Sequence, residues 1–301
     1  MLLSFSYLSR KPRSLPKAVS FEGLEGYDRL SGLKEKLLKR TNPHIACHGG
    51  RLEALSILDD LDRYSDYAQE RNIPSHDATT KLSAHHKFGT VSIRESFHAM
   101  KETLGEDHPL LRQLYWRDFF TGIAYYHPRV FAGTFQDIDE TGLWDDDADR
   151  FKRWCDGMTG FPLIDAGMRQ LVKTGYMHNR LRMATASFLT KDLHIDWRWG
   201  ERFFANHLID YDPSVNNASW QWAASTGSDA QPYFRIFNPW RQQKRFDPDG
   251  EYIRKWVDEL GAVSGKDLLD IEKKPVHGYP SPIIDHKVER DKTLERFKAR
   301  R

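Results

Sequence analysis

The residues with the clearest potential for chemistry lie in one run, 210–222, which reads DYDPSVNNASWQW. It combines two carboxylates, three side-chain amides and two indoles, and it shows little helical periodicity. A buried Asp or Asn requires a hydrogen-bond partner, so such a run packs poorly as plain core. We therefore expect a pocket that holds a flat polar heterocycle, and composition alone does not specify the ligand further.

Two more clusters could bind an anionic ligand. Hydroxyl groups gather at Thr79–Ser83, where they could cap a helix or, together with Lys81, bind a diphosphate. On spacing alone we favour the caps. Further along the chain, Asn179, Arg180 and Arg182 lie on or near one helix surface. Because the net charge is only +2, an acidic partner must be met by a local basic patch of this kind.

Several common catalytic and metal-binding motifs are absent from the sequence. There is no Walker loop, no G-x-G-x-x-G, no G-x-S-x-G elbow and no H-E-x-x-H signature. His44, Cys47 and His48 form a small cluster of soft ligands without a clear fourth member, so we expect no metal site. The sequence therefore argues against the conventional hydrolases and kinases.

Composition also bounds the compartment. The 301 residues include only two cysteines, which cannot form a disulfide framework. No window approaches the ~18 consecutive apolar residues of a transmembrane helix. The apolar and aromatic content is too high for a disordered chain. We expect a soluble globular protein without membrane contact in a reducing compartment: the cytoplasm, or the nucleus or an organelle of a eukaryote.

Helices must position these residues, because apolar side chains recur at helical spacing from residue 50 onward. Pro162 and Gly175 bracket one helix, and the apolar run 110–126 predicts another that is buried on all sides. Further apolar stripes span Leu52–Tyr64, Leu181–Leu189 and Ile253–Leu260. Strand alternation and Asn-Gly hairpin signals are absent. The sequence predicts an all-α fold, one compact body with long functional loops around 76–90 and 210–250.

The first 48 residues differ from the rest of the chain. They are basic, poor in periodic pattern and free of acidic residues before Glu22. Such a start can be a transit peptide, but we favour an arm that packs on the helical body. Within it, Leu30–Leu38 suggests a short helix. The expected organisation is an arm over 1–48 and one helical domain over 49–301.

Together with neighbouring motifs, these residues resemble the family of DNA photolyases and cryptochromes. The resemblance is long and colinear, and it covers Gly49–Arg51, Thr79–Ser83, Tyr115–Phe119, Thr159–Pro162, Tyr176–Met183, Trp220–Pro239 and Tyr279–Pro282. It points to the all-helical flavin domain of the class I cyclobutane pyrimidine dimer photolyases. Only the arm precedes Gly49 in this sequence, so we expect no counterpart of that family's N-terminal α/β antenna domain.

The resemblance implies a U-shaped FAD in a cavity of the helical body. Hydroxyl groups suit its phosphates, and charge-assisted hydrogen bonds suit a ring that must hold an anionic reduced state. Asp210 and Asp212 match the acids near the ribose and the flavin ring, and Arg182 matches the partner of Asp210. Asn216 matches the residue that faces flavin N5. The other matched contacts are Tyr67, Thr79, Thr80, Lys81, Leu82, Ser83 and Arg117.

The resemblance also assigns roles to five of the nine tryptophans, most of which residue type alone would place in the core. Trp144, Trp197 and Trp220 match a chain that relays single electrons inward and photoreduces FAD. Trp116 and Trp222 match the pair that receives the flipped dimer, whose bases stack on aromatic faces. The remaining substrate-side positions are Arg71, Gln113, Asn179, Arg180, Met183 and Gln242.

The implied activity is light-driven repair of cyclobutane pyrimidine dimers in UV-damaged DNA by an electron from excited reduced FAD. The run 176–183 lacks the extra histidines of the (6-4) class, and Asn216 stands where plant cryptochromes have Asp. Gln113 departs from the Glu that is common in cyclobutane-dimer enzymes, since it can hydrogen-bond a base but cannot supply a carboxylic proton.

Two alternatives stay open. One is a cryptochrome-like blue-light photoreceptor that binds FAD without repair, and the other is a flavin-free helical DNA-binding remnant. We expect a monomer, and whether a separate antenna polypeptide docks on it stays open.

Overall fold

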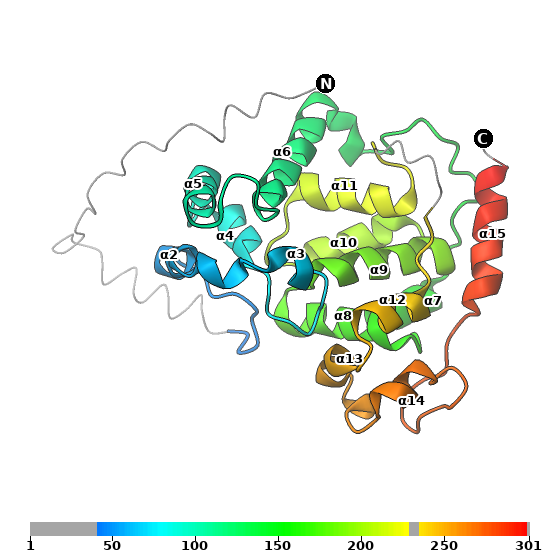
Figure 1. Ribbon diagram of the computed structural model, residues 1–301. Coiled ribbons are helices and arrows are strands. Elements are labelled where there is room, and N and C mark those ends of the chain that lie inside the picture. Colours follow the sequence, from blue (N-terminus) through cyan, green and yellow to red (C-terminus); the bar gives the residue numbers. More distant parts are fainter. Residues whose placement is uncertain (1–40, 229–234, 300–301) are drawn as a thin grey trace.

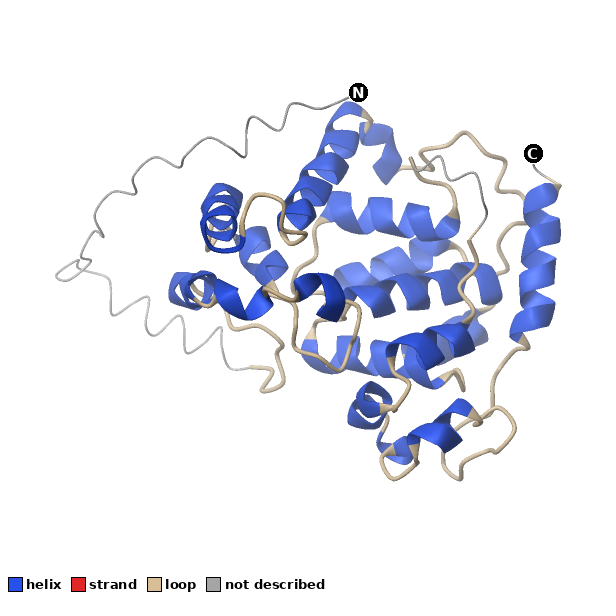
Figure 2. Ribbon diagram, viewed as in Figure 1, coloured by secondary structure: helices blue, strands red, loops and turns tan. Residues whose placement is uncertain are grey.

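Helices make up most of the described chain. Figures 1 and 2 show the computed structural model, which describes residues 41–228 and 235–299. Within these ranges there is no β-strand, and an isolated parallel bridge joins Asp145 to Ile195. The predicted all-α fold is confirmed.

The helices fall into three groups along the chain. The first comprises α2 (Arg51–Asp59), η2 (Leu61–Tyr64), α3 (Tyr67–Glu70), α4 (Leu82–Phe88), α5 (Ile93–Leu104), α6 (Leu111–Tyr126) and η3 (Pro128–Phe131). The second comprises α7 (Ala148–Cys155), α8 (Pro162–Thr174), α9 (Asn179–Ser187), η4 (Phe188–Asp192), α10 (Trp197–His207) and α11 (Pro213–Ala224). The third comprises α12 (Pro239–Phe246), α13 (Glu251–Trp256), η5 (Asp258–Leu260), α14 (Gly265–Leu269) and α15 (His286–Lys298). The turn η4 is π-helical and continues α9 directly.

Two buried apolar clusters hold the helices together. The larger one includes Trp154, Phe188 and Trp220 and joins α7 to α11. The smaller one joins α2, α4, α5 and α6 through side chains such as Leu82 and Phe97. In Figure 1, α2, α4 and α5 lie to one side of the layer formed by α8 to α11. The hydroxyl-rich segment before α4 and the polar run after α10 therefore belong to different clusters.

Helix α8 begins and ends at the residues that the sequence predicts. Pro162 takes its first position, and Gly175 follows its last residue with a φ of 70°, in the left-handed region. In the first turn the buried Asp165 accepts hydrogen bonds from the Thr159 backbone N–H (2.8 Å) and the Tyr279 hydroxyl (2.5 Å). These bonds fix the loop before α8 to a segment far along the chain.

The expectation that 110–126 is buried on all sides is wrong. Helix α6 covers this run, but Trp116 is 54% exposed and Tyr125 is 78% exposed. Leu52, which begins another expected apolar stripe, is 83% exposed. Large apolar side chains occur on surfaces as well as in cores, so their number does not tell the two apart.

Helices occupy part of the two segments that were expected to be long loops, and loops remain between α3 and α4 and on either side of the undescribed residues between α11 and α12. The segment 76–90 contains α4, and the segment 210–250 contains α11 and α12. The helix suggested by Leu30–Leu38 lies outside the described residues. Of the expected arm, only 41–48 is described, and there the Ala46 N–H donates to the Thr174 carbonyl at the end of α8 (3.1 Å).

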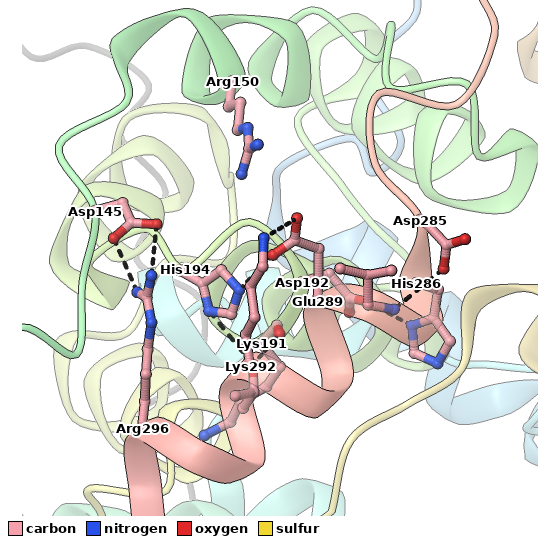
Figure 3. Close-up of polar contacts among 12 residues, drawn as sticks. Asp145, Arg150, Lys191, Asp192, His194, Asp285, His286, Glu289, Lys292 and Arg296 are labelled. Carbon is pink, nitrogen blue, oxygen red and sulfur yellow. Dashed lines mark hydrogen bonds and ion pairs between the residues drawn. The ribbon is translucent and has the colours of Figure 1, made fainter.

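Polar bonds hold the carboxy-terminal helix α15 against the rest of the molecule. Arg296 donates two hydrogen bonds to Asp145 (2.9 and 3.0 Å), beside the β-bridge. Glu289 lies 2.9 Å from the buried imidazole of His194. Figure 3 shows these partners converging from α15, from the end of η4 and from the segment before α7. Side chains of α15 thus bind both of the segments that meet at the bridge, one at Asp145 and the other at His194, the residue before Ile195.

Two buried charged residues at the end of η4 complete this contact. Asp192 pairs with His286, and burial raises the pKa of its carboxyl group to about 6. The Lys191 ammonium lies 3.9 Å from the centre of the Phe297 ring, and burial lowers its pKa well below the ordinary lysine value. Phe297 in turn meets Trp144 edge to face, with ring centroids 6.4 Å apart.

Candidate functional site

The buried carboxylate of Asp210 is the centre of the site. Arg182 donates to both of its oxygens through Nη2 (3.1 and 2.9 Å), and the Ser83 hydroxyl donates to Oδ2 (2.7 Å). Burial lowers the pKa of Arg182, but the charge of Asp210, the nearby Tyr176 and the hydrogen bonds to Asp210 together outweigh burial and hold the pKa above the ordinary arginine value. Since Ser83 lies on α4 and Arg182 on α9, the carboxylate joins the two apolar clusters.

Asp212 begins helix α11. Its Oδ1 accepts from the backbone N–H groups of Ser214 (2.9 Å) and Val215 (3.1 Å), as expected of an N-cap. Its Oδ2 lies 3.9 Å from the guanidinium of Arg117, which leaves this oxygen able to accept from a further donor. The polar run 210–222, which shows little periodicity in sequence, is therefore largely helical.

Asn216 lies in the first turns of α11 with its side chain held from one side. Its Nδ2 donates to both the carboxylate (2.9 Å) and the backbone carbonyl (3.2 Å) of Glu201 on α10. The amide nitrogen is thus engaged. The amide oxygen is the atom that Asn216 can offer to a ligand.

The segment 79–83 turns sharply before α4. Lys81 adopts a left-handed conformation with a φ of 54° and caps the helix without a side-chain hydrogen bond. The Thr80 hydroxyl accepts from the Leu82 N–H (3.3 Å), whereas Ser83 donates to the site carboxylate instead. The favoured capping interpretation therefore holds for Thr80 and is wrong for Ser83.

Two buried tyrosines flank this segment. The Tyr176 hydroxyl lies 3.4 Å from the Thr79 hydroxyl, and the Arg182 guanidinium lies 5.2 Å from the centre of its ring. The guanidinium of Arg71 lies over the ring of Tyr67 on α3, 5.5 Å from the ring centre. Burial raises the pKa of both tyrosines, so both hydroxyls stay protonated at neutral pH.

The small Cys/His cluster does not converge on one point. Cys47 Sγ lies 3.2 Å from His85 Nε2, and His85 Nδ1 lies 2.8 Å from the Thr90 hydroxyl. Among the residues that the structure describes, no three His, Cys, Asp or Glu side chains meet as metal ligands would.

The outer side of α9 carries the polar residues predicted to face a substrate. Asn179 is exposed, with its amide 3.8 Å from Met183 Sδ. Arg180 donates to the Asn72 side chain (2.6 Å) and lies 4.2 Å from the ring centre of Phe246. This guanidinium is therefore fixed in place between α12 and the segment after α3.

Trp116 and Trp222 lie on α6 and α11, two helices that pack against each other. Trp116 stacks on Phe120, with ring centroids 5.9 Å apart, and keeps about half of its surface free. Trp222 is half-buried and meets Phe237 edge to face at 6.3 Å. The two indoles, distant in sequence, thus belong to neighbouring helices.

Two glutamines complete the predicted substrate side. The side chain of Gln113, in the first turn of α6, donates to the carbonyl of Pro109, which precedes the helix (3.2 Å). Gln242 lies on α12, and its buried Oε1 has no hydrogen-bond partner among the described residues.

Of three further tryptophans predicted to act together, two are buried and one is half-buried. The ring of Trp220 is buried directly on α10, because a Cβ added at Gly200 would lie 2.2 Å from its Cη2. Trp197 precedes Gly200 on α10 by three positions and is also buried. Trp144 is half-buried and adjoins the bridge between Asp145 and Ile195, which leads directly into α10.

Two acidic residues that accept hydrogen bonds from candidate site residues were not predicted from the sequence. Glu201 is fifteen positions from Asn216, and no local pattern relates two residues at that distance. Glu140 is four positions from Trp144 and accepts its indole N–H (2.9 Å), a spacing that the sequence does offer.

Fold and site together define an all-helical domain with a buried polar centre that is suited to a flat, charged cofactor. The chain belongs to the family described as the FAD binding domain of DNA photolyase, which it matches over residues 110–299.

Named relatives agree with this assignment. The deoxyribodipyrimidine photo-lyase of Vibrio cholerae is 45% identical over 250 residues, which are 79% of this chain and 53% of the relative. The photolyase structure of Sulfolobus tokodaii, which holds two FAD molecules, has a TM-score of 0.78 at 43% identity, covering 90% of this chain and 60% of that one. The cryptochrome of Synechocystis has a TM-score of 0.76 at 34% identity, covering 84% and 57%.

The chain spans about half the length of the curated relatives it matches. No helix in the described ranges is long and apolar enough to cross a membrane.

Proposed function

We propose that the chain is the catalytic part of a light-driven lyase that splits cyclobutane pyrimidine dimers in UV-damaged DNA. The observation that carries the proposal is the Ser83–Asp210–Arg182 centre, in which three distant segments build one buried, charged site in a chain of this family. The relatives that it matches at about 45% identity bear the name deoxyribodipyrimidine photo-lyase.

The residues fit an FAD cofactor by the chemistry of their donors and acceptors. The Thr79 hydroxyl and the Lys81 ammonium suit phosphate oxygens, and the free oxygens of Asp212 and Asn216 suit N–H groups of a ring. Arg182 balances the charge of Asp210, so the site can hold a polar ring without an unpaired buried anion. Tyr67, Thr80, Leu82, Ser83 and Arg117 complete the proposed contacts. Bound FAD would supply a light-excited electron donor.

The three tryptophans Trp220, Trp197 and Trp144 would carry single electrons between the surface and the site. The burial of Trp220 and Trp197 and the partial exposure of Trp144 support this role. The close contact of the Trp220 ring with α10 fixes it beside the helix that bears Trp197.

The DNA side would comprise Trp116 and Trp222 as stacking faces. Arg71 and Arg180 would contact the phosphate backbone, and Gln113 the edge of the flipped base. Base–aromatic stacking is worth about 1–3 kcal/mol per base, which suits a flipped dimer held between two indoles. Asn179, Met183 and Gln242 would line the same face.

For the organisation of the chain, we propose an arm over 1–48 and a catalytic helical domain over 49–301. The protein would act as a monomer in a reducing compartment. A separate antenna polypeptide is a further partner that binding assays with such a domain would detect.

The test is repair of UV-irradiated oligothymidylate under blue light, with a dark reaction and Trp222→Ala as controls. Light-dependent recovery of intact thymines, reduced in Trp222→Ala, would support the proposal. A yellow protein that holds FAD but repairs nothing would instead support a cryptochrome-like photoreceptor, the second class among the similar structures. A colourless protein that FAD cannot reconstitute would exclude both.

A further inference from the structure

The carboxylate of Glu140 lies between two of the proposed relay tryptophans. Its Oε1 accepts the indole N–H of Trp144 (2.9 Å), and its Oε2 accepts from Arg198 Nη2 (2.6 Å). The same Arg198 guanidinium lies 4.8 Å from the ring centre of Trp197. Asp196 is the other acidic partner of Arg198, at 3.1 Å from its Nη1. One acidic side chain thus contacts Trp144 directly and the surroundings of Trp197 through an arginine.

Glu140 is ionised at neutral pH. Burial raises the pKa of its carboxyl group, but the hydrogen bonds from Arg198 and Trp144 and the charge of Arg198 act together against burial, so the pKa lies below the ordinary glutamate value. The Trp197 indole N–H adds to this lowering. It does so without a hydrogen bond of ordinary length, because Trp197 Nε1 has no such partner among the described residues.

An oxidised indole changes the chemistry of its N–H bond. When an indole loses one electron, its ring becomes a cation, and the N–H proton becomes far more acidic than in the resting side chain. A base already within hydrogen-bond reach speeds the loss of that proton. Trp144 is half-buried, and Glu140 is the base that its N–H already contacts.

Building on the proposed function, we propose that Glu140 is the proton acceptor of Trp144 during electron relay. Trp144 passes one electron to the oxidised ring of Trp197, its Nε1–H bond breaks, and the proton forms a new bond to Glu140 Oε1. The bonding pair stays on nitrogen, so Trp144 becomes a neutral indolyl radical, and Glu140 becomes a neutral acid. The charge beside the relay is thereby removed, which slows return of the electron. An external thiol restores Trp144 by supplying one electron, and Glu140 returns the proton.

The experiment follows proton loss from Trp144 by flash absorption spectroscopy, which distinguishes the indole radical cation from the neutral radical. It compares wild type with Glu140→Gln in the FAD-loaded full chain. Gln keeps an oxygen for the indole N–H but is a far weaker base. The matched control is Asp196→Asn, which alters the other acidic partner of Arg198 and preserves an N-cap residue for α10. A second measurement oxidises the FAD-free protein with a photo-oxidised ruthenium complex, so that the same step is read without the cofactor.

We expect Glu140→Gln to slow deprotonation about a hundredfold, the lower end of what a positioned base contributes, and Asp196→Asn to change it less than about twofold. Wild-type rates in Glu140→Gln, with no radical signal in Trp144→Phe, would overturn the role of Glu140 and leave the electron relay standing. An unchanged radical signal in Trp144→Phe would overturn the relay itself, and the role of Glu140 with it.

Discussion

The contact between Gly200 and Trp220 allows a quantitative test of the packing that sets the tryptophan relay. In Gly200→Ala, the added Cβ would lie 2.2 Å from Trp220 Cη2 and 2.5 Å from Leu189 Cδ2. Carbon atoms pack best at about 3.5–4.0 Å, so the ring must move by roughly 1.3 Å or more. Overpacking of this kind costs about 3 kcal/mol at the upper end of its usual range, and the better helix propensity of alanine returns about 1 kcal/mol.

We therefore expect Gly200→Ala to lower the free energy of unfolding by about 2 kcal/mol. Urea denaturation followed by circular dichroism at pH 7 measures this change, and near-ultraviolet circular dichroism reports the displaced indole. The control is Gly133→Ala, where an added Cβ meets nothing within 4 Å, and where we expect a change within about 0.5 kcal/mol. If Gly200→Ala is as stable as wild type, the ring of Trp220 does not lie against α10 as described.

Three further predictions concern other parts of the site. Arg182→Gln should lower the free energy of unfolding by about 3 kcal/mol, because Asp210 stays buried with Ser83 as its remaining partner. Urea denaturation measures this change, and a loss under about 1 kcal/mol would contradict the prediction. Burial and, next in size, the charge of Arg182 lower the pKa of His178 from 6.5 to about 4. The folded protein therefore favours the neutral imidazole, and the free energy of unfolding should fall by about 3 kcal/mol as the pH drops from 6.5 toward 4. His178→Asn keeps an acceptor for the start of α9, so its stability should depend less on pH over that interval, as paired denaturation curves would reveal. Tyr279→Phe removes a hydrogen bond to the buried carboxyl of Asp165 and should cost about 2 kcal/mol, which thermal unfolding would register.

Local signals in the sequence were enough to place individual elements. Pro162 and Gly175 act within a few residues of the chain, and the ends of α8 follow from them. The wrong prediction for α6 arose because Trp116 and Tyr125 are apolar residues on a surface, and composition carries no information on which side faces solvent.

The site itself depends on pairings that no local pattern encodes. Ser83 and Asp210 are 127 positions apart, and resemblance to a family, rather than spacing, pointed to both as parts of one site. The hydrogen bond between Asn216 and Glu201 required the packing of α11 on α10, which only the three-dimensional structure supplies. Glu140 could have been suspected from its spacing to Trp144, but it lies outside any helix, where such spacing has no fixed meaning.

The polar attachment of α15 makes this helix a separable unit of local unfolding. The side chains that it buries include His286, Glu289 and Thr293, so its docking depends on directional bonds more than on apolar area. Such a segment opens with a lower free energy than the central helices and exchanges its amide hydrogens sooner. Each opening would lift Phe297 from Trp144 and admit solvent to the outermost indole of the relay. The rate at which small reductants reach that indole would then depend on the rate of local unfolding of α15.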